Sequence, residues 1–363
     1  MASRSSEMKV LEVGSSLYDW GGIERYVAYL TEGLRGRGHE VTVSCPPGSP
    51  LDERVSGEKF RFALRGQFSP KNYLRYRKFF RGRSFDVIHL HFSPDFVMPA
   101  LAARHARAGK IVATRHVALK WSAGKVKRYT GLFDHIIPVS HAVEQKLAES
   151  GVPMQMMTVA KAGTPGLVAE RAPEAVRKDL GLADSEFVVG SFGRLVPEKG
   201  IEVLLKAVSA TQNARALIFG EGPHRPALED LARSLSITDR AEFKGFVPNV
   251  ADAMNACDLV AVPSTWDEAF PSSVLEAMSL GRPVVASRVG GLPEIVESGI
   301  TGMLFERNND QELASVLRGL IADEGKRVTM GETAKTRHRE DYTVEKMAER
   351  IEQVFLRVGD PKI

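Results

Sequence analysis

Two glutamates separated by seven residues mark the part of the chain with the clearest chemical content, the stretch Trp266 to Phe305. Glu268 precedes a predicted helix start and Glu276 follows it. Carboxylates placed in this way can accept hydrogen bonds from the vicinal hydroxyls of a sugar or a ribose, each contributing about 1.5–3 kcal/mol. Both residues also have structural explanations. Ser273 and Glu276 fit a helix capping box, and Glu268 fits a solvated loop.

Two cations follow a predicted strand in GSFGRLVPEKG, residues 190–200. Arg194 and Lys199 lie between that strand and a predicted helix, so we expect both at the ligand-binding edge of a sheet. Two positive charges there suit a diphosphate, whose negative charge grows when it becomes a leaving group. The alternative is an ordinary solvated loop.

Gly21 and Gly22 end the loop after the first predicted strand and open a predicted helix at Ile23. Glycines let a backbone approach a ligand closely, and a helix N-terminus attracts anions. A tight turn without a ligand explains the same pair. The segment does not have the Gly-x-Gly-x-x-Gly spacing of dinucleotide-binding proteins, which argues against an NAD-dependent oxidoreductase.

Three histidines lie on or beside predicted strands. His116 sits just past the strand Ile111–Thr114, at the same expected ligand edge. His89 and His91 alternate on one strand, and no third ligand with metal-site spacing stands beside them. We interpret them as strand residues that face the core or a cleft. The sequence contains no Asp-x-Asp pair to hold a divalent metal on a diphosphate, and we predict no metal site.

Strand and helix patterns alternate along the chain, which predicts an α/β fold with doubly wound parallel sheets. The expected strands are Lys9–Val13, Val41–Ser44, Asp86–Leu90, Ile111–Thr114, His135–Val139, Val188–Phe192, Ala216–Phe219, Leu259–Val262 and Pro283–Ala286. The expected helices are Ile23–Arg37, Pro94–Ala108, Ala142–Ser150, Ile201–Ala210, Arg225–Leu235 and Ser273–Leu280.

A chain of 363 residues is long enough for two domains. We predict Rossmann-like domains over residues 1–165 and 185–340, joined by a linker over 166–184. A final amphipathic helix, 343–358, is expected to pack back onto the first domain. Two such domains facing each other would leave a cleft between the carboxyl ends of their strands, where ligands of these sheets bind.

The charge is unevenly distributed. Residues 1–165 hold 25 Lys and Arg against 14 Asp and Glu, or +11, and the remainder holds 24 against 31, or −7. Much of the excess lies in SPKNYLRYRKFFRGR, residues 69–83, and in KWSAGKVKR, residues 120–128. The first reads as a helix with one aromatic face (Tyr73, Tyr76, Phe80) and one basic face (Lys71, Arg75, Lys78). Such a helix suits peripheral contact with an anionic membrane or an anionic acceptor; a packed helix with a solvated face is the alternative.

The composition argues against a membrane-spanning protein and against a disulfide-stabilised one. No apolar run reaches transmembrane length and no signal-peptide core follows the N-terminus, so we predict no spanning helix. The two cysteines, Cys45 and Cys257, fall in different predicted domains, which favours a reducing cytoplasm over a disulfide framework. We expect a cytoplasmic protein, peripheral at the inner face of the membrane, that binds no nucleic acid.

Together these segments resemble the retaining glycosyltransferase family 4, nucleotide-sugar-dependent enzymes of the GT-B fold. The resemblance covers nearly the whole chain and includes GGIERYVAYLTEGLRGRGHEVTV, GRLVPEKG, FGEGP, FKGFVPNV and the Glu-x7-Glu spacing. It implies that Glu276 binds the ribose, that Glu268 holds the transferred sugar, and that Arg194 and Lys199 neutralise the diphosphate. It further implies substrate contacts for Gly21, Gly22, Ala269 and Phe270 and places His116 near the reacting carbon.

The chain departs from the family pattern at several positions. Ala269 stands where Glu-Gly-Phe is frequent, and Ala162 stands where Asn-Gly is frequent. The strand before His116 also ends in Arg115, which brings a charge next to that histidine.

The function implied is transfer of a sugar, with retention and without metal or other cofactor, from a nucleotide sugar to a glycan or lipid-linked acceptor. A UDP-sugar is the favoured donor and bacterial surface-glycan assembly the favoured setting. A nucleotide-sugar epimerase of the same fold and a non-catalytic nucleotide-sugar-binding protein are the alternatives.

Overall fold

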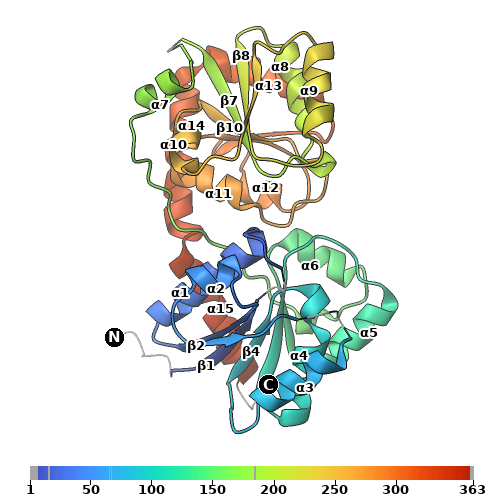
Figure 1. Cartoon of the computed structure of the whole chain (residues 1–363). Coiled ribbons are helices and arrows are strands. Elements are labelled where there is room, and N and C mark those ends of the chain that lie inside the picture. Colours follow the sequence, from blue (N-terminus) through green and yellow to red (C-terminus); the bar gives the residue numbers. More distant parts are fainter. Residues whose placement is uncertain (1–6, 15–16, 65, 67, 184, 360–363) are drawn as a thin grey trace. The chain divides into compact units, whose positions relative to one another are not determined.

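The chain forms two units, each built on a six-stranded parallel sheet (Figure 1). The computed structural model describes residues 7–14, 17–64, 66, 68–183 and 185–359. The first unit comprises Met1–Thr164 together with Thr343–Ile363, and the second comprises Pro165–Tyr342.

The first unit alternates strands and helices and receives its last helix from the end of the chain. Its strands are β1 (Lys9–Val13), β2 (Glu40–Cys45), β3 (Lys59–Arg61), β4 (Val87–Leu90), β5 (Lys110–Arg115) and β6 (His135–Pro138). Its helices are α1 (Gly22–Gly36), α2 (Pro50–Arg54), α3 (Pro70–Phe79), η1 (Ser93–Asp95), α4 (Val97–Ala106), α5 (Ala123–Leu132), α6 (His141–Ala148), η2 (Met154–Met156) and α15 (Val344–Gly359).

The sheet of the first unit has the order β3-β2-β1-β4-β5-β6. The direction of winding therefore reverses between β1 and β4, and polar side chains that follow these strands meet at one edge. α15 packs on α1, where a Cβ atom on Gly33 would lie only 2.8 Å from that of Ala348. The buried carboxylate of Glu352 accepts hydrogen bonds of 2.8 Å from Arg37 Nε and His39 Nε2, which fixes α15 to this unit.

The second unit repeats the arrangement. Its strands are β7 (Phe187–Phe192), β8 (Ala214–Phe219), β9 (Ala241–Gly245), β10 (Leu259–Val262), β11 (Val284–Ser287) and β12 (Gly302–Phe305). Its helices are α7 (Pro173–Asp179), η3 (Pro197–Lys199), α8 (Ile201–Ser209), α9 (Arg225–Ser234), α10 (Val250–Asn255), α11 (Ser272–Ser279), α12 (Leu292–Ile295), α13 (Asp310–Ala322) and α14 (Glu324–Asp341).

Helices cover both faces of the second sheet, whose order is β12-β11-β10-β7-β8-β9. Alternate strand residues supply separate cores: Val189 and Ile218 pack with α8, α9 and α13, whereas Val188 and Leu217 pack with α10. Figure 1 shows α8 and α9 on one side of β7 and β8 and α10 on the other. The winding reverses between β7 and β10, the point that positions the site described below.

The predicted doubly wound α/β architecture is confirmed, and each predicted strand coincides with an observed one within a few residues. The edge strands β3, β9 and β12 were not predicted. β3 and β9 are largely half-exposed, so their sequences lack the buried apolar runs of the inner strands.

Residues 166–184 differ from the linker expected there, because they belong to the second unit and contain α7. Arg177 of α7 is buried and donates to the carbonyls of Ala256 and Ala183, each at 3.1 Å. The backbone N–H of Glu170 donates to Asp252 at 2.7 Å. These bonds hold the segment on the second sheet although its sequence lacks a regular pattern.

Candidate functional site

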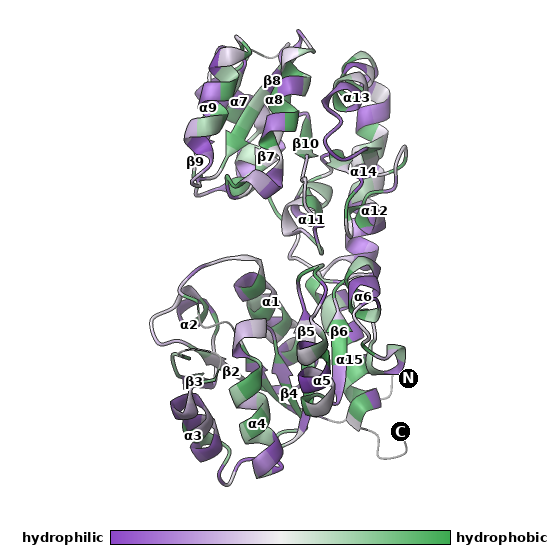
Figure 2. Ribbon diagram, turned by 90° about the vertical axis from the view of Figure 1, so that its right-hand side faces the viewer, coloured by the Kyte–Doolittle hydropathy of each residue, from purple (hydrophilic) through white to green (hydrophobic). Residues whose placement is uncertain are grey.

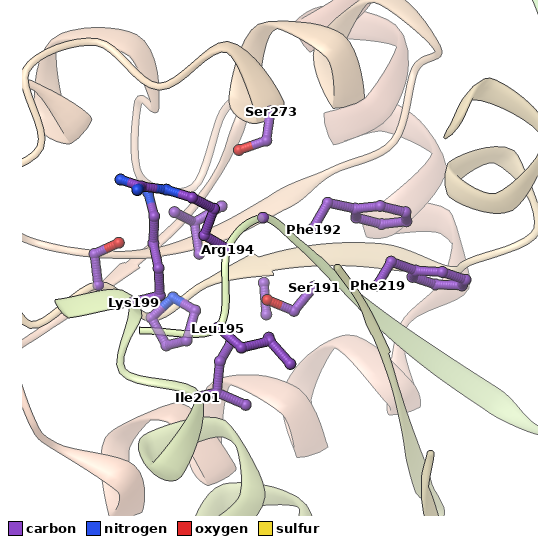
Figure 3. A pocket seen from close by; sticks show the side chains of 13 residues that line it. Ser191, Phe192, Arg194, Leu195, Lys199, Ile201, Phe219 and Ser273 are labelled. Atoms are coloured by element: carbon purple, nitrogen blue, oxygen red, sulfur yellow. The ribbon is translucent and has the colours of Figure 1, made fainter. Parts of the chain in front are cut away.

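A pocket lies where the winding of the second sheet reverses, at the carboxyl ends of β7 and β10. Parallel sheets bind ligands at this position because the loops on the two sides diverge there. It is lined by Ser191, Phe192, Gly193, Arg194, Leu195, Lys199, Ile201, Phe219, Ala261, Val262, Pro263, Ser264 and Ser273. Figure 3 shows the side chains of Arg194 and Lys199 extending along the same edge of the pocket.

Lys199 and Glu268 are joined directly at this edge. Lys199 Nζ lies 2.6 Å from Glu268 Oε1, and the buried hydroxyl of Ser264 donates to the same oxygen at 2.7 Å. The Glu268 side chain is only 16% exposed and that of Lys199 30%, so both are held in place rather than freely solvated. The exposed Arg194 makes no ion pair with any residue that the structure describes. No carboxylate among the described residues therefore neutralises its positive charge.

Close glycine contacts hold the loop that carries the two cations. A Cβ on Gly220 would lie 1.9 Å from the carbonyl oxygen of Gly193, and one on Gly222 would lie 2.2 Å from that of Leu195. The FGEGP segment after β8 thus packs directly against the loop after β7. Phe192 and Phe219 stack beneath it with ring centroids 4.6 Å apart. The two close contacts explain the glycine spacing of the FGEGP segment.

A second glycine pair fixes Glu268. Gly291 N–H donates to the carbonyl oxygen of Glu268 at 2.7 Å. Gly290 has a φ of +52°, and a Cβ there would lie 2.1 Å from the same oxygen. Only a glycine permits this approach. The Gly-Gly turn after β11 is therefore the backbone support of the carboxylate.

Glu276 is buried in α11, with 4% of its surface exposed. The predicted capping box of Ser273 and Glu276 is wrong, since α11 begins at Ser272, its N-cap is Pro271, and no side chain caps it. Ser273 instead lines the pocket one residue into the helix. The sequence signature misled because Pro271 supplies an extended residue that enters the helix without a capping hydroxyl.

Ala269 and Phe270 follow Glu268 into α11. Ala269 is buried, with 9% exposed. The ring of Phe270 is half-buried against the core around Val274 and lies 5.8 Å from the ring of Tyr342. Both residues therefore have packing contacts within the second unit, and packing accounts for their apolar character.

Gly21 and Gly22 begin α1 in the first unit. Gly21 is the N-cap, and its N–H donates to Glu24 Oε2 at 3.1 Å. A Cβ on Gly22 would meet no described atom within 4 Å, so the packing of this unit does not require a glycine there. Residues 15 and 16 of the preceding loop lie outside the described part of the chain.

His116 follows β5 at the matching edge of the first sheet and is half-buried. Its Nε2 lies 3.4 Å from Nδ1 of His91, and the ring of Tyr26 packs edge-on at 4.6 Å. Burial lowers the pKa of His116 well below 6.5, as do the neighbouring His91, His89 and Arg115. Arg115 is turned away from His116 and donates to Ser93 Oγ at 2.7 Å.

Glu12 is the residue that the sequence interpretation missed. It is fully buried on β1 and accepts hydrogen bonds from both His89 and His91. Within the described residues these three form a group whose possible ligand atoms all lie within 4.8 Å of one another. A glutamate inside the apolar strand KVLEV was the available signal, because a carboxylate buried in a parallel sheet requires a partner.

The two basic clusters of the first unit are joined through Phe68. Arg128 of α5 lies over the Phe68 ring at 5.0 Å. We define the basic surface as the exposed residues Phe68, Lys71, Leu74, Arg75, Lys125, Lys127 and Arg128. The two predicted faces of α3 are confirmed: Tyr76 and Phe80 are buried, Tyr73 is half-buried, and Lys71, Arg75 and Lys78 are exposed. Figure 2 draws most of α3 in the hydrophilic colour.

Two family models match the chain. The model described as Glycosyltransferase Family 4 matches residues 20–163, and the model described as Glycosyl transferases group 1 matches residues 173–337. Both matches support a glycosyltransferase of the family 4 type. Group 1 glycosyltransferases of the GT-B fold generally act without a metal.

Curated relatives of this chain carry the names of different enzymes. A D-inositol 3-phosphate glycosyltransferase of Corynebacterium kroppenstedtii is 34% identical over 205 residues, which are 53% of this chain and 45% of that protein. The chain thus spans about half of the length of the first of these relatives. An N-acetyl-alpha-D-glucosaminyl L-malate synthase of Bacillus anthracis is 27% identical over 283 residues, which are 74% of each chain.

Solved structures share the architecture. The crystal structure of Anabaena HepE in complex with UDP-glucose has a TM-score of 0.85 and 26% sequence identity, over 97% of this chain and all of that one. With the two parallel sheets, this likeness confirms the predicted GT-B fold of two Rossmann-like domains. Within the described residues, no helix combines the length and apolar character needed to cross a bilayer.

Proposed function

We propose that this glycosyltransferase transfers a sugar from a nucleotide-diphosphate donor, with UDP as the favoured nucleotide, to a glycan or lipid-linked acceptor. The observation that carries the proposal is the group formed by Lys199, Glu268 and Arg194 at the point where the winding of the second sheet reverses. HepE, whose crystal structures contain UDP, glucose and UDP-glucose, supports UDP as the nucleotide.

Each side chain of this group has a part in the proposed reaction. Arg194 and Lys199 stabilise the diphosphate, which gains negative charge as the bond to the anomeric carbon breaks. Glu268 accepts hydrogen bonds from hydroxyls of the transferred sugar, and Glu276 from those of the ribose. Among the described residues, Lys199 and Ser264 both bond Oε1 of Glu268, so we assign the other carboxylate oxygen as the acceptor for the sugar.

In the first unit, we assign the backbone of Gly21 and Gly22 to the diphosphate and His116 to the sugar. The open space beside Gly22 supports the first assignment, since nothing in the packing of α1 explains a glycine at that position. Ala269 and Phe270 are assigned to the substrate site through their backbone, because their side chains pack inside the second unit.

We propose transfer with retention at the anomeric carbon. In this reaction the bond between that carbon and the diphosphate oxygen breaks, and the acceptor oxygen forms its bond on the same face. The acceptor proton passes to the departing phosphate oxygen, so that nucleoside diphosphate is released. This route needs no protein general base.

The basic surface is the proposed contact with an anionic membrane, in a cytoplasmic protein of bacterial surface-glycan assembly. It also includes Leu74 and Phe68, which are 62% and 55% exposed, and Arg128 lies over the Phe68 ring. Exposed apolar side chains combined with cations are typical of interfacial binding. Near an anionic bilayer each such charge contributes on the order of 1 kcal/mol. We expect the protein to sediment with vesicles that contain anionic lipid. This binding should be lost in high salt and absent for neutral vesicles. An anionic acceptor in solution is favoured instead if the protein binds no vesicle at low salt.

The donor is tested by thermal shift against UDP-, GDP- and ADP-sugars, because a ligand that binds the folded state raises its stability. The matching nucleotide sugar should then release nucleoside diphosphate when acceptor is added. NMR of the donor alone separates the classes of enzyme. An epimerised sugar without acceptor would identify an epimerase, and tight donor binding with no reaction toward any acceptor would favour a binding protein.

A further inference from the structure

The register of the first sheet places five polar side chains on one of its faces. Glu12 of β1 is paired with His89 of β4, and His89 is paired with Val112 of β5. Side chains two residues apart on a strand share a face. His91, Thr114 and His116 therefore lie on the same face as Glu12 and His89, and His91 and His116 each directly follow the last residue of their strand.

Hydrogen bonds link the other four side chains to Glu12: His89 and His91 directly, and Thr114 and His116 through these two histidines. His91 bonds Glu12 Oε2 through Nε2, and its other ring nitrogen, Nδ1, lies 3.4 Å from Nε2 of His116. His89 lies 3.0 Å from Glu12 Oε2 through Nδ1 and 2.6 Å from Thr114 Oγ1 through Nε2. Glu12, His89, His91 and Thr114 are 2% exposed or less, so these bonds are shielded from water.

The proton positions follow from the charge of Glu12. Burial alone would raise its pKa, but the contacts with His89 and His91 prevail and lower the pKa to about 2. An ionised carboxylate only accepts, so His91 donates through Nε2. Burial and His89 lower the pKa of His91 to about 4, which leaves it neutral with a bare Nδ1 at pH 7. The proton between the two rings must then be carried by Nε2 of His116.

We propose that Glu12 and His91 are positioning residues that fix His116 as the tautomer protonated on Nε2, with Nδ1 as its acceptor nitrogen. For the reaction, this inference rests on the proposed function: Nδ1 would accept a hydrogen bond from a hydroxyl of the transferred sugar. An imidazole with an unfixed tautomer would present an acceptor there for only part of the time.

Glu12, His89 and His91 are compatible by residue type with a metal ion, but their geometry favours hydrogen bonds. Zinc bonds of about 2.0–2.1 Å in a tetrahedral site hold ligand atoms roughly 3.3 Å apart. Nδ1 of His89 lies 3.0 Å from Oε2 of Glu12, and Nε2 of His91 is closer still. Glu12 thus contacts both imidazoles directly.

The test uses two variants that each keep a donor to Glu12. His91→Gln reproduces the Nε2 position and loses the contact with His116, whereas His89→Asn reproduces the Nδ1 position and loses the contact with Thr114. Nitrogen-15 NMR of histidine-labelled protein, with the His116 signals assigned by His116→Gln, reports which ring nitrogen carries the proton. We expect wild type and His89→Asn to show protonated Nε2 and bare Nδ1 in His116, and His91→Gln to show a mixture.

Activity provides the second readout. In His91→Gln, kcat should fall roughly 10- to 100-fold, by analogy with residues that orient metal-bound imidazoles, with little change in the donor KM. His89→Asn should retain wild-type kcat. Thermal unfolding of both variants identifies losses that come only from destabilisation.

Three results would overturn the inference: a wild-type His116 protonated on Nδ1, an unchanged His116 signature in His91→Gln, or stoichiometric zinc that depends on His89. If wild type shows the expected tautomer but transfers no sugar, the assignment of His116 stands and the proposed function fails.

Discussion

Lys199 Nζ and Glu268 Oε1 lie 2.6 Å apart, although the two residues are separated by 69 positions in the sequence. The bond connects the loop after β7 with the loop after β10. It places the positive charge proposed for the diphosphate next to the carboxylate proposed for the sugar. A donor would therefore meet both charges as one preformed unit.

Replacement of Lys199 should affect the chemical step more than binding. Lys199→Ala is expected to lower kcat by about 10²–10³-fold, since loss of one group that stabilises developing negative charge typically has this effect. Lys206→Ala removes an exposed lysine of α8 and is the matched control. Steady-state release of nucleoside diphosphate measures the kcat of both variants. Equal activity of the two variants would contradict the assignment of Lys199.

Gly290 and Gly299 form a matched pair for the support of Glu268. Both have positive φ, +52° and +87°, so alanine costs about 1–2 kcal/mol of backbone strain at either position. Only at Gly290 would the new Cβ also collide with the Glu268 carbonyl, since Gly299 has no described atom within 4 Å. We expect Gly290→Ala to lose more unfolding free energy in urea, and to lose activity, whereas Gly299→Ala stays active. Equal losses of unfolding free energy in the two variants would show that the turn accommodates the new Cβ atom at Gly290 without a further loss of stability.

The attachment of α15 depends on a buried carboxylate. Glu352 is 1% exposed and bonds Arg37 and His39, so Glu352→Ala leaves both partners uncompensated. Removal of one partner of a buried pair typically costs about 3–5 kcal/mol. Glu349→Ala, which removes a 48% exposed carboxylate 3.3 Å from Lys346 on the same helix, should cost less than about 1 kcal/mol. Urea unfolding compares the two, and similar values would mean that packing on α1 alone holds the helix.

Acid should weaken the fold through His91. Burial and the neighbouring His89 lower its pKa from 6.5 to about 4 in the folded protein, against the opposing effect of Glu12. The unfolded chain takes up this proton near pH 6.5 and the folded chain only near pH 4. The contribution of neutral His91 to the free energy of unfolding is therefore complete above pH 6.5. It is lost as the pH falls toward 4 and amounts to on the order of 3 kcal/mol in total. Urea unfolding at several pH values should show a shallower dependence for His91→Gln, and an unchanged slope would exclude His91 as its source.

The sequence was sufficient for the inner strands, because each is an apolar run buried on both faces of a parallel sheet. It was insufficient for edge strands such as β9, whose residues are mostly half-exposed. Arg194, Lys199 and Glu268 could be grouped in advance, since residues that follow neighbouring parallel strands meet at one edge. The roles of Ser264 and Gly290 depend on contacts across many residues, which no local pattern records.

Glu12 shows the same limit in the first unit. The alternation of His89 and His91 was visible, but their common partner lies 77 positions from His89. Only the register between β1 and β4 brings the three together. A strand register is set by the whole sheet, so neither segment reveals the other by its own composition.

The return of α15 to the first unit has a consequence for synthesis on the ribosome. The second unit is one continuous stretch, Pro165–Tyr342, whereas the first is completed only by residues that follow it. The N-terminal part of the first unit is therefore synthesised first, but the unit is completed last. The apolar side of α1 has no α15 to pack against until the second unit has been translated. Completion of the first unit therefore follows synthesis of the second, the reverse of the usual N-terminal-first order in two-domain chains.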